Sequence, residues 1–91
     1  MQIHRLLEMI PLLMKRKSMT AAQLARHFEV STRTVLRDVE ALSAAGIPVY
    51  TLQGRGGGIA IMESYVLSHS LLSQEEQNRI MLALQSLSAA G

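Results

Sequence analysis

The sequence predicts a mainly α-helical fold with one small two-stranded β-hairpin, in the order helix, helix, helix, hairpin, helix. Apolar residues recur at helical spacing before and after the hairpin. Two short β-prone runs, IPVYTL and IAIM, flank the glycine-rich QGRGGG. Only a few residues separate the second and third helices, which is helix-turn-helix spacing, and the hairpin then stands where a wing would sit.

The composition describes one small domain with an aliphatic core. The chain has 91 residues, of which 48% are apolar and only 3% aromatic. It has no cysteine, which excludes disulfides and thiolate sites and fits a reducing cytosol. No apolar run reaches the roughly 20 residues that span a bilayer. We therefore expect a cytoplasmic protein without a membrane partner.

The first helix is expected from about Gln2 to Lys17, where large apolar residues recur every three or four positions. Pro11 lies inside it, and because proline lacks an N–H and crowds the preceding turn, we expect a kink there. Thr20 and Gln23 have the pattern of a capping box. A second, short helix should therefore begin after Thr20 and end near Phe28.

The third helix is expected over about residues 32–45. Ser31 precedes it as an N-cap, because its hydroxyl can accept a bond from the free N–H groups of the first turn. Gly46 closes it in the left-handed conformation, and Pro48 prevents its continuation.

This helix carries two arginines opposite its apolar side. At about 100° per residue, Arg33 and Arg37 share one face of the helix. Val35, Val39 and Leu42 share the opposite face. A planar guanidinium can bond guanine O6 and N7 together, so these arginines are candidates for reading bases in the major groove. The expected scaffold is Leu24, Phe28, Val35, Val39 and Leu42.

Three hydroxyl residues at the start of the helix, Ser31, Thr32 and Thr34, can donate to phosphates or bases, and the helix N-terminus itself attracts phosphate. The alternative for the arginines is an ordinary solvated face, with Arg33 paired to Asp38 or Arg37 to Glu40. The helix-turn-helix order and the wing favour DNA.

The wing is expected over residues 53–58, with Arg55 reaching a phosphate or the minor groove. A phosphate-binding loop is excluded, because no Gly-Lys-Ser/Thr follows and a strand, not a helix, comes next. The alternative is a hairpin tip that carries one exposed arginine.

A last helix is expected from about Gln74 to Leu87, because Ser73 and Glu76 repeat the capping-box pattern. Its apolar residues are too many to stand free in water, so we expect a homodimer through this helix. The alternatives are that it folds back onto the winged part or packs on a further domain. The apolar residues are Leu71 and Leu72, just before the helix, and Ile80, Leu84 and Leu87 within it.

Charge and histidine placement narrow the function. Residues 1–58 hold eight of the nine Lys/Arg and four of the seven acids, a balance of +4, whereas residues 59–91 have a balance of −2. The three histidines have no ligand-like spacing, and no motif groups Ser, His and Asp. We expect no enzyme activity, no metal and no cofactor.

The stretch MTAAQLARHFEVSTRTVLRDVEALSAAGIPVYTLQGRGGGIAI resembles the DeoR-type winged helix-turn-helix of bacterial WYL-domain transcriptional regulators. The resemblance covers roughly residues 6–62. It implies that the third helix reads an operator and that Arg55 acts in the wing. LSQEEQNRIMLALQSL is similar to the segment that leads towards the effector domain in these regulators.

The sequence thus predicts a DNA-binding domain over residues 1–62, then a linker and helix over 63–91 that begin the connection to an absent effector domain. The expected function is sequence-specific binding of double-stranded DNA in transcription regulation. One alternative is a winged module for protein–protein contact without DNA binding. Another is a sensor with a small ligand between the winged part and the last helix, although no residue marks a pocket.

Overall fold

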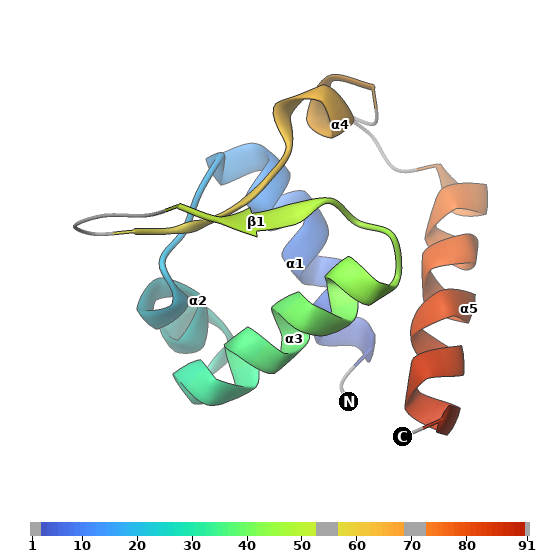
Figure 1. Ribbon diagram of the computed structural model, residues 1–91, viewed down its shortest axis with the longest axis horizontal. Helices are drawn as coiled ribbons and strands as arrows, with labels where there is room; N and C mark the ends of the chain where they lie inside the picture. The colour runs from blue at the N-terminus through green and yellow to red at the C-terminus, as the bar shows by residue number, and fades with distance from the viewer. Residues whose placement is uncertain (1–2, 53–56, 69–72, 91) are drawn as a thin grey trace.

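The computed structural model describes residues 3–52, 57–68 and 73–90 (Figure 1). The predicted order of three helices, hairpin and final helix is confirmed, and one short helix that the sequence analysis did not predict, α4, follows the hairpin. The elements are α1 (Ile3–Arg16), α2 (Ala21–Phe28), α3 (Thr32–Ala44), β1 (Val49–Thr51), β2 (Ile59–Ile61), α4 (Glu63–Ser68) and α5 (Gln74–Ala90).

The helix boundaries follow the capping residues. The Thr20 hydroxyl accepts from the Gln23 backbone N–H at 3.0 Å, and the Gln23 side chain accepts from the Thr20 N–H at 2.9 Å, which completes the predicted capping box. The Ser31 hydroxyl caps α3 by accepting from the Thr34 N–H at 3.1 Å. Gly46 ends that helix with φ of 96°, a conformation that glycine adopts without strain.

The proline expected to kink the first helix lies inside a continuous α1. Pro11 is exposed, so its ring points away from the core. The helix therefore keeps one unbroken apolar face, whose buried residues are Leu6, Met9, Ile10 and Leu13.

The core is aliphatic, as the composition predicts. Leu24, Val35 and Leu42 are fully buried, and Phe28 and Val39 pack against them half-buried, so the predicted scaffold is confirmed. α2 and α3 pack on each other, and their buried side chains join those of α1 in one hydrophobic core.

The hairpin is antiparallel and is tied to the helices through the segment after α1. Val49 pairs with Ile61, and Thr51 pairs with Ile59. The Met19 N–H donates to the Ile59 carbonyl at 3.1 Å, and the Ile59 N–H donates back at 2.7 Å. Met19 therefore forms an isolated antiparallel bridge with β2, which connects the hairpin to the segment after α1.

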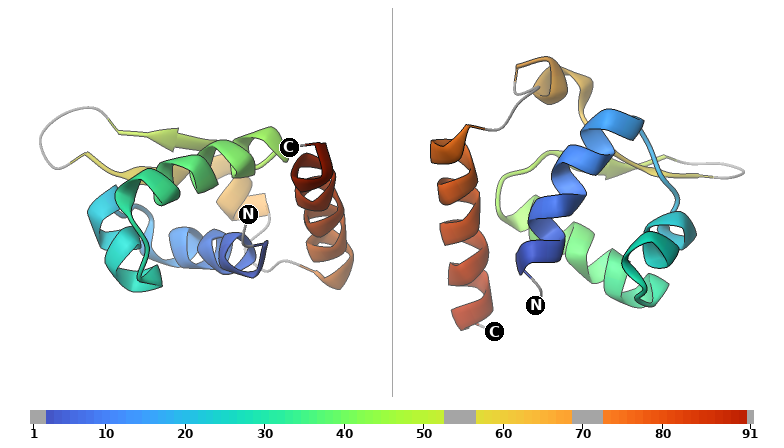
Figure 2. Two further views of the ribbon diagram at one scale, coloured as in Figure 1. Left: turned by 90° about the horizontal axis from the view of Figure 1, so that it is seen from below. Right: turned by 180° about the vertical axis from the view of Figure 1, so that it is seen from behind.

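The last helix folds back onto the winged part. α5 packs beside α1 and also contacts α3 (Figure 2). Ile80 and Leu84, which motivated the homodimer, are 7% and 0% exposed within the single chain. The surface expected to form a dimer is thus largely covered by α1 and α3 of the same chain. This is the alternative in which the last helix folds back onto the winged part. Leu71 and Leu72 lie outside the described residues.

Among the described side chains of α5, Leu82 is an exposed large apolar residue, at 65% exposure. In the part of the chain that the structure describes, no helix is both long and apolar enough to cross a bilayer.

Candidate functional site

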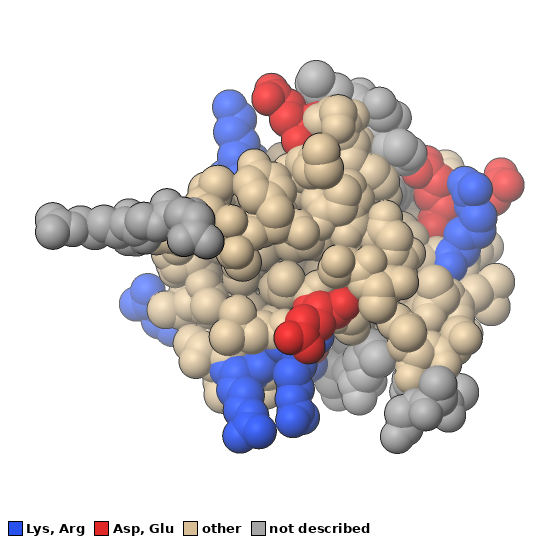
Figure 3. Space-filling model, viewed as in Figure 1, with Lys and Arg blue, Asp and Glu red and all other residues tan. Residues whose placement is uncertain are grey.

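The first half of α3 presents the predicted polar residues on the outer surface. Ser31, Thr32, Arg33 and Arg37 are exposed, and Thr34 is half-buried. In Figure 3, most Lys and Arg side chains in view lie on the side that carries α2 and the start of α3, and most acidic side chains lie over α4 and α5. The charge asymmetry of the sequence is thus also an asymmetry of the surface.

A partly buried ion pair joins α1 to the inner side of α3. The Arg5 Nε donates to Asp38 Oδ2 at 2.6 Å, and its Nη2 donates to Oδ1 at 3.0 Å. The two side chains are only 15% and 4% exposed. This bidentate bond from α1 holds Asp38 on the inner side of α3. Arg33, five residues earlier, and Arg37, one residue earlier, then lie on the outer side.

The hydrogen bond to Asp38 raises the pKa of Arg5; burial opposes this shift, and the negative charge of Asp38 adds to it. The Arg5 guanidinium therefore keeps its positive charge at neutral pH. The alternative pairing of Arg33 with Asp38 is wrong, because the Asp38 carboxylate is already engaged by Arg5.

Neither arginine of the outer face is neutralised by a neighbour. Within the described ranges, Arg33 and Arg37 form no ion pair, so the alternative pairing of Arg37 with Glu40 is not seen either. Their guanidinium groups keep all their donors for a ligand outside the chain.

The hydroxyl groups at the start of α3 have unequal freedom. Besides capping the helix, Ser31 donates its hydroxyl hydrogen to Thr34 Oγ1 at 3.0 Å. The Thr34 hydroxyl accepts that bond and can still donate outward, whereas Thr32 is exposed. No acid lies in the first turn of α3, so the positive end of the helix is not compensated.

The predicted wing residue Arg55 lies outside the described residues. The strands before and after it, β1 and β2, lie on the same side of the molecule as α2 and the start of α3 (Figures 1 and 2). The exposed arginines of α3 and the two strands therefore lie on one side of the domain.

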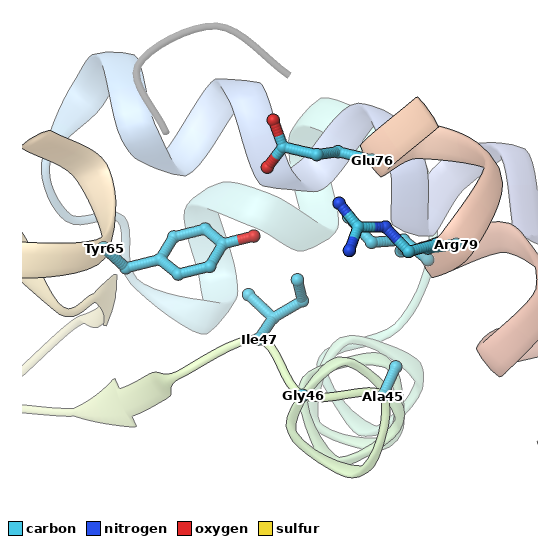
Figure 4. Close-up of a pocket in the computed structure, with 7 residues that line it drawn as sticks. Ala45, Gly46, Ile47, Tyr65, Glu76 and Arg79 are labelled. Carbon is cyan, nitrogen blue, oxygen red and sulfur yellow. The ribbon is translucent and has the colours of Figure 1, made fainter. Parts of the chain in front are cut away.

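A hollow of about 220 Å³ lies between the end of α3, α4 and α5 (Figure 4). Tyr65 from α4 points its hydroxyl into it, towards Glu76 and Arg79 of α5. Burial raises the pKa of Tyr65, the Glu76 carboxylate adds to that shift, and Arg79 opposes it. The sequence gives no sign of this hollow, because its walls come from elements that are distant in sequence.

Among the residues that the structure describes, no group of three His, Asp or Glu side chains is arranged to hold a metal ion. The geometry that stands out is one exposed, cationic helix start beside a hairpin.

Comparisons with known proteins agree with that geometry. The family model described as HTH domain matches residues 5–59. The chain is 52% identical, over 89 residues and 98% of its length, to the uncharacterized HTH-type transcriptional regulator YobV of Bacillus subtilis. It spans 28% of the length of that protein. No solved structure matches the chain.

Proposed function

The chain belongs to the HTH (helix-turn-helix) domain family, and from this premise we propose that it binds duplex DNA in a sequence-specific manner and regulates transcription. The relative's name as an HTH-type transcriptional regulator supports the same function. A role as a regulator also argues for a non-enzymatic, cytoplasmic protein.

One observation carries the proposal: Arg33 and Arg37 are exposed, without ion pairs in the described ranges, on the first half of α3. In helix-turn-helix proteins the start of the second helix of the motif meets base edges in the major groove. We assign base reading to these two arginines and phosphate contacts to Thr32, Thr34 and the N-terminus of α3.

Ser31 takes a revised role. Because its hydroxyl is engaged twice within the chain, we assign it to the helix cap first and to phosphate only through the N–H groups that it orients. For the wing, we propose that residues 53–58 lie on the backbone or in the minor groove, with Arg55 as the anchor.

A pair of substitutions at Ser31 separates the cap from the DNA contact. Ser31→Ala should destabilise the fold by about 0.5–2 kcal/mol, because the cap is lost. Ser31→Asp should keep the stability, since Asp is also a good cap, but should weaken DNA binding by placing a negative charge next to the phosphates. Urea denaturation measures the change in stability, and DNA titration measures the change in affinity. Equal DNA affinity of Ser31→Asp and wild type would show that no phosphate binds near residue 31.

Selection from a random-sequence duplex pool, at two salt concentrations, tests the proposed function. We expect one enriched motif whose affinity falls steeply with salt, because phosphate contacts release counterions. Salt-sensitive binding without enrichment would leave only non-specific binding. Absence of binding at both salt concentrations would overturn the proposal in favour of a protein-interaction module.

Two finer assignments remain proposals. The first is membership of the DeoR-type regulators with a WYL domain, with residues 1–62 as the DNA-binding unit. The second is a homodimer through α5, which now rests on exposed Leu82 rather than on the buried Ile80 and Leu84. A palindromic motif would support the dimer, and a monomer in sedimentation at high protein concentration would count against it.

A further inference from the structure

One large apolar side chain lies on the polar outer side of α3. Leu36 is 49% exposed, and it stands between Arg33 and Arg37 along the helix. Within α3, which the structure describes throughout, the other exposed positions carry polar, charged or small residues. They are Thr32, Arg33, Arg37, Glu40, Ser43 and Ala44. Leu36 is therefore the one large apolar group on the side of α3 that meets DNA under the proposed function.

Helix geometry places this side chain close to both arginines. Successive residues of an α-helix rise by about 1.5 Å, so Leu36 lies about 1.5 Å before Arg37 and about 4.5 Å after Arg33 along the axis. Long side chains on a helix lean towards its N-terminus, which carries the leucine over the turn that holds Arg33. Leu36 thus belongs to the first half of α3, the half that approaches base edges in helix-turn-helix proteins.

The surroundings of Leu36 are unlike a protein-docking surface. Such surfaces are contiguous apolar areas on the order of several hundred Å². Among the described residues, the other exposed large apolar side chains lie on other elements, and they are Tyr50, Leu52, Met62 and Leu82. Along the outer side of α3, the neighbours of Leu36 are polar or charged. This surface therefore fits one small apolar group that is framed by groups able to form hydrogen bonds.

We propose that Leu36 is a specificity-determining residue that contacts the C5 methyl group of a thymine in the major groove. The inference rests on the proposed function and deepens it, because it names a second base that the operator contains. The thymine methyl is the apolar group that base pairs present in the major groove, and packing it against leucine removes both apolar surfaces from water. Because Leu36 and Arg37 lie at nearly the same height on α3, this thymine should lie within about one or two base pairs of the guanine that Arg37 reads.

Deoxyuridine tests this contact, because it pairs with adenine as thymidine does and lacks only the methyl group. Each thymine of the selected duplex is replaced in turn, and fluorescence anisotropy gives the affinity of wild type, Leu36→Ala and Leu36→Met. We expect wild type to lose about fourfold in affinity at one thymine, which corresponds to the burial of one methyl group. At that position Leu36→Ala should bind the thymine and uracil duplexes equally. Leu36→Met keeps an apolar side chain of similar volume and should keep most of the discrimination.

Methylated cytosine gives an independent readout. Where a C·G pair replaces the T·A pair at this position, 5-methylcytosine restores the C5 methyl group but not the O4 acceptor of thymine. Wild type and Leu36→Met should therefore bind the methylated duplex about fourfold more tightly than the unmethylated one. Leu36→Ala should bind the two equally. Binding at this position should thus respond to cytosine methylation.

Leu82→Ala is the matched control, because it truncates an exposed leucine of α5 instead of α3. It should leave the ratio of affinities for the thymine and uracil duplexes unchanged at every position, and loss of the discrimination in this variant would contradict a local contact of Leu36. Leu36→Ala should keep the helix content and stability of wild type, since Leu36 is exposed and alanine is the best helix former. Circular dichroism and urea denaturation check this.

The outcomes separate this inference from the proposed function. If wild type binds the selected duplex but discriminates at no thymine, Leu36 reads no methyl group, and the proposed function stands. If wild type discriminates and Leu36→Ala does so equally, another residue reads the methyl group, and this inference is overturned. If wild type enriches no motif, the proposed function fails, and the inference fails with it.

Discussion

Replacing Arg33 and Arg37 together by alanine should weaken binding to the preferred duplex by about 2–6 kcal/mol, because each bidentate arginine–base pair contributes about 1–3 kcal/mol. Arg37→Ala alone should cost about 1–3 kcal/mol and relax the preference at one base pair. Stability should change little, since both side chains are exposed and form no ion pair within the described ranges. Fluorescence anisotropy with the selected duplex and with duplexes altered at single base pairs measures both effects.

The matched control is Arg79→Ala, which removes an exposed arginine from α5. It should leave the preference at every base pair unchanged. A double variant that lost affinity equally on all sequences would show that Arg33 and Arg37 contact phosphates and that the bases are read by other residues.

Asp38→Ala should destabilise the fold by about 1–3 kcal/mol, because it leaves the partly buried Arg5 guanidinium without its hydrogen-bond partner. The free energy of unfolding of small domains is about 5–15 kcal/mol, so this loss is a sizeable part of the stability. Urea denaturation followed by circular dichroism measures it. The effect should exceed that of removing any exposed charge on α3.

Glu40→Ala serves as that comparison, since Glu40 is an exposed acid on the same helix, and its cost should stay within about 0.5 kcal/mol. Arg5→Met combined with Asp38→Leu should regain stability relative to Asp38→Ala, because an apolar pair leaves no charge buried. Equal stability of Asp38→Ala and Glu40→Ala would contradict the role given to the ion pair.

Features set by neighbours along the chain could be predicted from the sequence. The caps at Thr20, Ser31 and Ser73, the turn at Gly46 and the antiparallel hairpin each depend on a few adjacent residues, and all are confirmed. The outward direction of Arg33 and Arg37 follows from helical periodicity in the same way.

Features set by contacts between distant elements could not. In the sequence, Asp38 looks like an ordinary surface charge. Only the fold, which places α1 beside α3, brings Arg5 within hydrogen-bond distance of it. The stripe of α5 is visible in the sequence, but periodicity does not tell whether a second chain or the same chain covers Leu84. α4 has only six residues, which is too few for a periodic signal.

In the proposed binding site, too, local features could be predicted from the sequence and contacts formed by the fold could not. The arginines of α3 could be predicted because they share one helix. The sequence predicts that the Ser31 hydroxyl accepts from the first turn of the helix, but it does not show that the same hydroxyl also donates to Thr34 Oγ1.

The most direct test of the account replaces each guanine of the selected duplex in turn by 7-deazaguanine, which lacks the N7 acceptor in the major groove. We expect wild type to lose affinity at one or two guanines, by about 1–3 kcal/mol each. Arg33→Ala or Arg37→Ala should show no further loss at the guanine that its arginine reads. If no guanine matters to wild type, or if the loss persists unchanged in both variants, α3 does not read the major groove through these arginines.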